Sequence, residues 1–128
     1  MSHKSFTSDG SVIVLDADIS SKITVHTRLV LDTGATFVIL PWRIINALDI
    51  RIDSDSLVTM STASTVESTP LVILPKVKVL GNTVNKVQCL VKDLPPESGV
   101  DGLLGLSFLR HFILHLDFPH GMLSFKKY

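Results

Sequence analysis

The sequence has only one cysteine, Cys89, and few aromatic residues, which make up 6% of its 128 residues. A single cysteine excludes a disulfide framework within the chain, so the fold needs no oxidising compartment. Hydrophobic residues still account for 45% of the chain, and since few of them are aromatic the core must be mainly aliphatic. A chain of this length buries roughly two thirds of the surface that it exposes when unfolded. These values predict a single domain at residues 11–128 behind a flexible, polar N-terminal arm at residues 1–10.

An excess of charge of either sign is also lacking, since Lys+Arg and Asp+Glu each number 12 and the formal net charge is zero. Without a basic field or patch the sequence predicts no nucleic-acid partner. The apolar runs are too short to cross a bilayer, and residues 1–10 contain no signal-peptide core, so we expect no membrane segment. We favour a cytoplasmic protein or a soluble domain of a larger one. An apolar chain without net charge often covers part of its surface in an oligomer.

What the sequence does contain is a succession of β-branched and alternating segments, which predicts an all-β fold with one or two short helices. Strands are expected at residues 11–19, 22–31, 37–40, 57–60, 66–79, 83–92, 100–105, 113–118 and 122–125. Short helices are expected at residues 42–48, with Pro41 near the helix start, and at residues 106–112. The two strands within residues 57–79 form a long hairpin with a small, polar tip near Ala63, which suits a cover over a groove.

The most informative stretch is Asp32-Thr33-Gly34-Ala35-Thr36, which lies between the apolar runs 29–31 and 37–40. A carboxylate in this position is expected at the end of a strand, at the edge of the core. Burying an ionised carboxylate without partners is costly, so donors must surround it. The following residues supply hydroxyls, a permissive glycine and the free amides of a turn. The pattern therefore predicts a carboxylate that is held in a fixed position for chemistry.

This stretch resembles the active-site motif of aspartic peptidases, an apolar strand followed by Asp-Thr/Ser-Gly-Ala/Ser. Downstream, Asp101-Gly102-Leu103-Leu104-Gly105 resembles the second element of that family, an apolar strand that ends at a glycine before a short helix. The single Asp-Thr-Gly and the intervening hairpin are similar to the single-lobe retropepsin type. The resemblance implies a retropepsin-like closed β-barrel or sandwich with a flap hairpin, acting on peptide substrates without a metal or cofactor. Because catalysis needs two carboxylates that share a proton, it also implies a homodimer.

The resemblance assigns a role to each residue of the motif. It implies that Asp32 is the catalytic acid and base, that Thr33 hydrogen-bonds across the dimer axis, and that Gly34 allows a backbone amide to reach the carboxylates. Ala35 is expected at the floor of the groove, and the hydroxyl of Thr36 is expected to hold the loop. The flap tip corresponds approximately to Thr62, Ala63, Ser64 and Thr65, which lack the glycines of viral flaps.

Other polar residues have simpler interpretations. Asp101 is a candidate second catalytic carboxylate, but a turn residue before the following strand is the favoured interpretation. His111 and His115 lack the His-Glu-x-x-His pattern of zinc peptidases, and we expect no metal site there. Cys89 has no thiol-protease pattern and is expected in the core. Ser107 fails the Gly-x-Ser-x-Gly pattern of a nucleophile elbow, because Leu109 replaces the last glycine.

Two functional alternatives stay open at this point. The same fold could serve as a non-proteolytic dimerisation or peptide-binding module, because the motif itself does not report whether the groove is open. The chain could also be an inactive precursor that becomes active after its N-terminal arm is trimmed. A binding module would bind peptides without cleaving them, whereas an aspartic endopeptidase would cleave them. A precursor would cleave peptides only after its N-terminal arm is removed.

Overall fold

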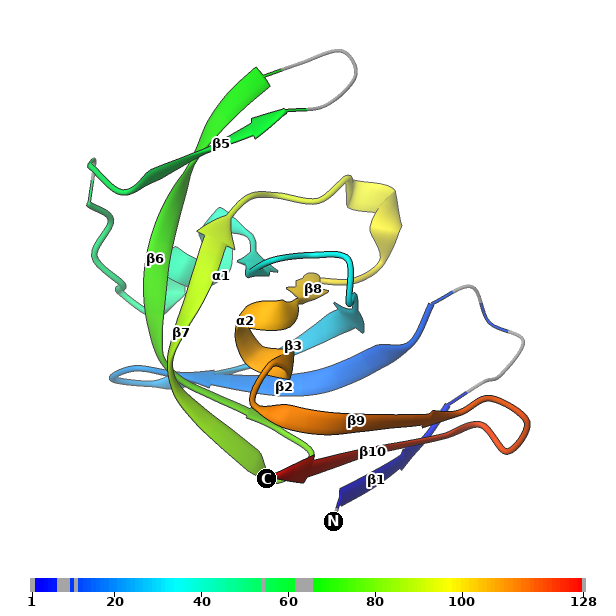
Figure 1. Ribbon diagram of the computed structural model, residues 1–128. Helices are drawn as coiled ribbons and strands as arrows, with labels where there is room; N and C mark the ends of the chain where they lie inside the picture. The colour runs from blue at the N-terminus through cyan, green and yellow to red at the C-terminus, as the bar shows by residue number, and fades with distance from the viewer. Residues whose placement is uncertain (1, 7–9, 11, 54, 62–65, 128) are drawn as a thin grey trace.

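The structure, a computed structural model, describes residues 2–6, 10, 12–53, 55–61 and 66–127. Ten strands account for most of the described chain, with two short α-helices and one 3₁₀ turn (Figure 1). The strands are β1 (Ser2–Ser5), β2 (Val14–Ser20), β3 (Thr24–Leu31), β4 (Val38–Leu40), β5 (Leu57–Ser61), β6 (Val66–Val79), β7 (Asn82–Val91), β8 (Gly102–Leu104), β9 (Phe112–Asp117) and β10 (Met122–Lys127). The helices are α1 (Trp42–Ala47), α2 (Leu106–Leu109) and the 3₁₀ turn Pro96–Ser98. The predicted all-β class is confirmed.

Six strands close into a barrel in the order β2-β3-β8-β4-β7-β6, because β6 also pairs with β2. Most neighbours are antiparallel, but β3 pairs with β8, and β4 with β7, in parallel. Each parallel pair joins segments that are far apart in the sequence. The crossed connections bring the end of β3, the start of β4 and the end of β8 to the same place in the barrel.

The alternation of buried and exposed residues along the barrel strands explains why the barrel closes over an aliphatic core. Along β2 and β3 buried and exposed positions alternate, and the buried side chains point into the barrel. By contrast, β4 is buried at all its positions because it lies between β7 and β8. Cys89 is fully buried in this core, as expected. Phe108 lies in the same core and packs against Phe112 and Phe125, with ring centroids 5.1 and 6.1 Å away.

Beyond the barrel, β5 and β6 continue as a two-stranded hairpin that projects over the opening, as Figure 1 shows at the top. The pairing runs from Leu57 with Pro70 to Ser61 with Val66. This is the hairpin predicted over residues 57–79. Its predicted tip at Thr62, Ala63, Ser64 and Thr65 lies outside the described residues.

A second, smaller sheet has the order β1-β10-β9 and lies below the barrel in Figure 1. The sequence predicts the terminal hairpin β9–β10, but it does not predict β1. Within the segment expected to be a flexible arm, Ser2–Ser5 pairs with Met122–Phe125. The amide of Phe6 donates to the carbonyl of Gly121 at 2.7 Å, next to an edge-to-face contact between Phe6 and Phe118. The polar sequence of β1 gives no signal, because an edge strand needs backbone partners more than apolar side chains.

Candidate active site

Asp32 is the first residue after β3, and the neighbouring strand fixes its backbone. The amide of Asp32 donates to the carbonyl of Leu104 at 3.1 Å, which extends the β3–β8 ladder by one bond. The chain then turns, because the amide of Ala35 donates to the Asp32 carbonyl at 3.2 Å. The Asp32 side chain is half-buried. Strand pairing therefore delivers the carboxylate to the edge of the core, as the two apolar runs around it predict.

Gly34 supplies the donor that the carboxylate needs. Its amide donates to Oδ1 of Asp32 at 2.9 Å. A Cβ atom on Gly34 would lie 3.2 Å from the same oxygen, which is tighter than ordinary van der Waals contact. Glycine thus lets the backbone approach the carboxylate closely enough to hydrogen-bond to it. A carboxylate that accepts a backbone amide is held in one orientation while its second oxygen remains available.

The loop of residues 32–37, called the Asp32 loop below, is also held from the α2 side. The amide of Leu106 donates to the Ala35 carbonyl at 2.8 Å, and the amide of Ser107 donates to the Thr36 carbonyl at 2.9 Å. A Cβ atom on Gly105 would lie only 2.3 Å from the carbonyl oxygen of Phe37. The glycine that ends the downstream apolar strand is therefore required because the Asp32 loop passes directly over it.

A cavity of about 400 Å³ opens beside Asp32. Its lining is Asp32, Gly34, Ala35, Thr36, Phe37, Ile39, Val58, Thr59 and Leu90. Asp32 is the single charged residue among the described residues of this lining, and Phe37, Ile39, Val58 and Leu90 make the rest largely apolar. Val58 and Thr59 come from β5, so the projecting hairpin forms one wall of the cavity. A carboxylate in an apolar cavity under a hairpin is an arrangement suited to binding an extended, apolar segment of a peptide.

Four of the five motif residues meet at this cavity: Asp32, Gly34, Ala35 and Thr36. Thr33 is exposed and lies outside its lining. The sequence points to the hydroxyl of Thr36, but this residue contacts α2 through its backbone carbonyl. The predicted flap residues 62–65 lie outside the described residues, so the described part of the hairpin reaches the cavity through Val58 and Thr59.

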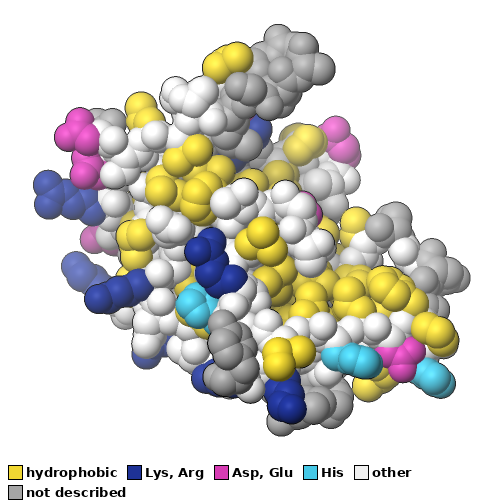
Figure 2. Space-filling model, viewed as in Figure 1, with side chains coloured by type: hydrophobic (Ala, Val, Ile, Leu, Met, Phe, Trp, Pro, Cys, Tyr) yellow, Lys and Arg dark blue, Asp and Glu magenta, His cyan; other side chains and the backbone are white. Residues whose placement is uncertain are grey.

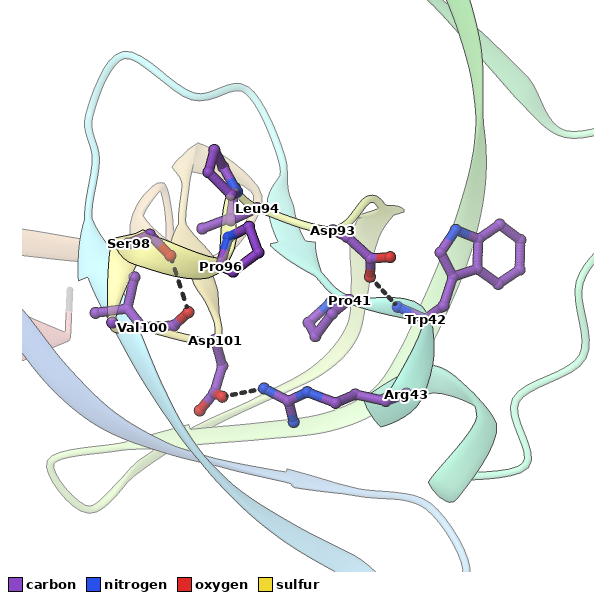
Figure 3. A pocket seen from close by; sticks show the side chains of 11 residues that line it. Pro41, Trp42, Arg43, Asp93, Leu94, Pro96, Ser98, Val100 and Asp101 are labelled. Atoms are coloured by element: carbon purple, nitrogen blue, oxygen red, sulfur yellow. Dashed lines mark hydrogen bonds and ion pairs between the residues drawn. The ribbon is translucent and has the colours of Figure 1, made fainter.

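Asp101 lies at the opposite end of the β3–β8 pair, in a different environment (Figure 3). Its Oδ2 accepts the backbone amide of Arg28 at 2.8 Å, and its Oδ1 pairs with the guanidinium of Arg43. Burial raises the pKa of Asp101, but the hydrogen bonds from Arg28 and Arg43 and the charges of both residues outweigh burial and lower the pKa below its usual value. Asp101 lines a separate cavity of about 540 Å³ with Arg43 and the loop of residues 93–100. It is a structural turn residue, as favoured above, and does not join Asp32.

The other candidate residues do not form a site. Within the described residues no cluster of three or more His, Cys, Asp or Glu side chains could hold a metal ion. Burial raises the pKa of the Cys89 thiol strongly, which disfavours the reactive thiolate. His111 and His115 are both exposed. In the described part of the chain no helix is both long and apolar enough to cross a membrane.

Sequence reasoning misses Ser107 as a residue that supports the Asp32 loop. It considers only whether Ser107 could be a nucleophile, but the side chain is 5% exposed and fully hydrogen-bonded. The apolar spacing of residues 106–112 does not indicate this role, because Leu106, Leu109 and Phe112 define a face of the predicted helix that excludes Ser107. A buried polar residue of this kind is recognised only through its hydrogen-bond partners. Those partners come from β4 and β7, which periodicity alone does not bring together.

Comparison with known proteins identifies the family and the fold. Residues 15–108 match the sequence family described as aspartyl protease, and the chain belongs to this family. Among solved structures it is similar to a retropepsin-like aspartic protease from Rickettsia conorii, with a TM-score of 0.68 and 20% sequence identity. That superposition covers 96% of this chain and 98% of the other, and the fold is therefore retropepsin-like, as the motif resemblance implies. No protein in the curated set matches significantly.

Proposed function

We propose that this protein is an aspartic endopeptidase that works as a homodimer, with one Asp32 contributed by each chain. The observation that carries the proposal is a single Asp-Thr-Gly turn, held by strand β8 and helix α2, whose carboxylate is open to a cavity under the β5–β6 hairpin. Within the described residues no second carboxylate lines that cavity. Hydrolysis of a peptide bond by this chemistry requires an acid and a base together, so a second copy must supply the partner.

In the proposed reaction the two Asp32 carboxyl groups share one proton and hold a water molecule between them. The ionised carboxylate takes a proton from the water as its oxygen attacks the carbonyl carbon of the scissile bond. The protonated carboxyl group donates its proton to the carbonyl oxygen, which gives a neutral tetrahedral diol. Collapse of the diol breaks the C–N bond: one diol hydroxyl loses its proton to the ionised carboxylate as the new carbonyl forms, and the protonated carboxyl group of the pair gives its proton to the leaving nitrogen. The pair again holds one proton.

The roles of the other motif residues follow from their positions. Gly34 orients the carboxylate through its amide, and Ala35 and Thr36 line the cavity where substrate backbone lies. Thr33 is exposed beside Asp32, where it is available to a second chain across the two-fold axis. The apolar side chains of Phe37, Val58 and their neighbours favour substrates with apolar residues beside the cleaved bond.

An exposed apolar face supports the assembly of two chains. Figure 2 shows hydrophobic side chains gathered on the right of the molecule, where β9 and the start of β2 lie in the same view in Figure 1. Val12 and Phe118 are 53% and 51% exposed, and Leu106, directly beside the Asp32 loop, is 39% exposed. Large apolar patches on soluble chains commonly mark interfaces.

The proposal is tested by cleavage of an unbiased peptide library over a pH series, with wild-type protein and Asp32→Asn. We expect cleavage by the wild type only. Mixing Asp32→Asn protein with wild-type protein at constant total concentration should lower activity with the square of the wild-type fraction, because a mixed dimer lacks one carboxylate. A linear decrease would show that each chain acts alone. A stable dimer in sedimentation that binds peptides without cleaving them would favour the binding-module alternative.

A further inference from the structure

Ser107 is a buried, hydrogen-bonded polar residue beside the Asp32 loop, although it is not part of the cavity lining. Its Oγ accepts the backbone amide of Val38 at 2.9 Å and donates to the carbonyl of Gln88 at 2.7 Å. Val38 begins β4, and Gln88 lies in β7 one residue before the partner of Val38. The hydroxyl therefore bridges two neighbouring strands at the first pair of their parallel ladder.

The backbone of Ser107 contacts the Asp32 loop as well. Its amide donates to the Thr36 carbonyl at 2.9 Å, beside the bond from Leu106 to Ala35. The loop thus has a defined start, where the Asp32 amide meets Leu104, and a defined end, where the Val38 amide meets Ser107. Only residues 33–37 lie between these two anchors. A shift of the second anchor must be absorbed within the turn that orients the Asp32 carboxylate.

A hydroxyl is suited to this bridge because one oxygen can donate and accept at the same time. Val38 is fully buried, so its amide has no access to water if the Ser107 oxygen is removed. Buried backbone amides are almost always paired, and an orphaned amide makes the surrounding backbone move toward another acceptor. In this position the movement would act on the loop that carries Asp32.

We propose that Ser107 is a positioning residue for the catalytic aspartate: its buried hydroxyl ties the end of the Asp32 loop to β4 and β7, and so sets the placement of each carboxylate at the dimer axis. This inference rests on the proposed function, since it concerns the geometry of the same reaction. Ser107 touches neither the substrate cavity nor Asp32. Its contribution to turnover is therefore made through the loop.

The test compares Ser107→Ala with Thr27→Val. Thr27 is the matched control, because its buried hydroxyl (3% exposed) also donates to a backbone carbonyl, that of Ala17 at 2.8 Å, at a point in β3 remote from the Asp32 loop. For Ser107→Ala we expect kcat on a cleaved peptide to fall by about tenfold to a hundredfold, with KM nearly unchanged, since small misplacements of catalytic groups have effects of this size. Thr27→Val should leave kcat within about twofold of the wild type and alter only the thermal midpoint. Ser107→Thr, which retains the hydroxyl, should restore most of the lost kcat.

A second measurement keeps the inference testable without turnover. Amide hydrogen exchange followed by NMR should show faster exchange at Val38 and Gly34 in Ser107→Ala, and unchanged exchange there in Thr27→Val. If the wild type cleaves no peptide, the proposed function fails, and the exchange rates still decide whether Ser107 orders the loop. If Ser107→Ala retains wild-type kcat, or if both variants lose activity and protection in parallel with their stability, the inference is overturned. Should Ser107→Ala not fold, Ser107→Cys, a smaller change of the same shape, takes its place with the same expectations.

Discussion

Asp32 and Asp101 lie at opposite ends of the same parallel strand pair and are held in opposite ways. Asp32 follows β3, accepts one amide from its own turn and, among the described residues, has no cationic partner. Asp101 precedes β8 and is bound by the Arg28 amide and the Arg43 guanidinium. A carboxylate whose partners are a backbone amide and an open cavity can exchange protons with a substrate. A carboxylate that is paired with a guanidinium is stabilised in its ionised form and joins segments of the fold.

The comparison extends to the backbone around each residue. Asp32 is carried by a tight loop whose carbonyls pack on Gly105, whereas Asp101 closes a loop of residues 93–100 over α1 (Figure 3). The first arrangement fixes one side chain at a defined point. The second connects β3, β8 and α1 without leaving a free functional group. Under the proposed function, the same residue type serves chemistry at one end of the pair and stability at the other.

The largest expected effect comes from replacing each of the two aspartates by asparagine, which exchanges one carboxylate oxygen for an amide nitrogen at either end of the β3–β8 pair. Asp32→Asn should lower kcat by at least about 10²–10⁴-fold, the range that general acid–base catalysis contributes, with little change in the thermal midpoint. Asp101→Asn should do the reverse, keeping kcat within about threefold while lowering the thermal midpoint. Steady-state kinetics and calorimetry of both variants measure the contrast. Equal losses of kcat in the two variants would remove the distinction between a chemical and a structural aspartate.

The next largest effect is expected at Gly105, which supports the Asp32 loop. Gly105→Ala places a Cβ atom 2.3 Å from the Phe37 carbonyl oxygen and 2.7 Å from that of Ala35, so the loop must move. Overpacking of this kind destabilises by about 1–3 kcal/mol, and we expect a loss of kcat in the protein that remains folded.

The control for Gly105→Ala is Gly99→Ala, in the loop that leads to Asp101. Gly99 has a φ of 70°, and no heavy atom of the described chain outside its immediate neighbours lies within 4 Å of the point that an alanine Cβ would occupy. Alanine there adds only backbone strain, of about 1–2 kcal/mol. Its kcat should be that of the wild type. Denaturant unfolding gives both free energies, and Gly105→Ala with full kcat would show that the loop tolerates the shift.

How much of this arrangement could be predicted from the sequence depends on how far apart in the chain the interacting residues lie. The barrel strands are predictable because alternation and turn residues act locally, and the placement of Asp32 at a strand end follows from the apolar runs beside it. The requirement for Gly105 is anticipated only as a motif position, and its reason, the Phe37 carbonyl that packs on it, appears in the structure alone. Strand β1 is missed because its pairing with β10 joins the two ends of the chain.

The polar contacts around the site are the least predictable. Ser107 bridges Val38 and Gln88, which are 69 and 19 residues away in the sequence, and Arg43 meets Asp101 across 58 residues. No local pattern encodes these distances. The resemblance assigns a holding role to the Thr36 hydroxyl, and the structure adds a contact that no motif describes, from the Ser107 amide to the Thr36 carbonyl. Side-chain chemistry could be predicted from the motif, but the backbone groups that position it depend on the closed barrel.

A smaller effect is expected when the pH is lowered. It concerns the contribution of Asp101 to stability and needs no measurement of activity. The pKa of Asp101 is lowered in the folded protein from its ordinary value of 3.8: burial opposes the ionised form, but the hydrogen bonds and the neighbouring charges favour it more strongly. A depressed folded-state pKa contributes stability above the unfolded pKa, and this contribution is lost as the pH falls through the folded pKa. The thermal midpoints of wild type and Asp101→Asn should therefore differ most near neutral pH and converge below pH 3.8. A difference that is constant across the titration would show that the ionised form is not what stabilises the fold.

The smallest effect is expected when only the cation of the Asp101 cluster is removed. The Arg43 side chain is 66% exposed, whereas that of Asp101 is 24% exposed, so solvent screens the pair from the arginine side. Arg43→Gln removes the guanidinium but leaves the Arg28 amide bound to the carboxylate, and the loss should be about 1 kcal/mol or less. Lys22→Gln, whose partner Asp49 is also exposed at 3.8 Å, is the matched control and should have no measurable effect. Unfolding in low and high salt measures both variants, and the Arg43→Gln difference should shrink as salt rises. A larger and salt-independent loss would mean that the guanidinium, more than the backbone amide, holds Asp101, and that the structural aspartate depends on α1 rather than on β3.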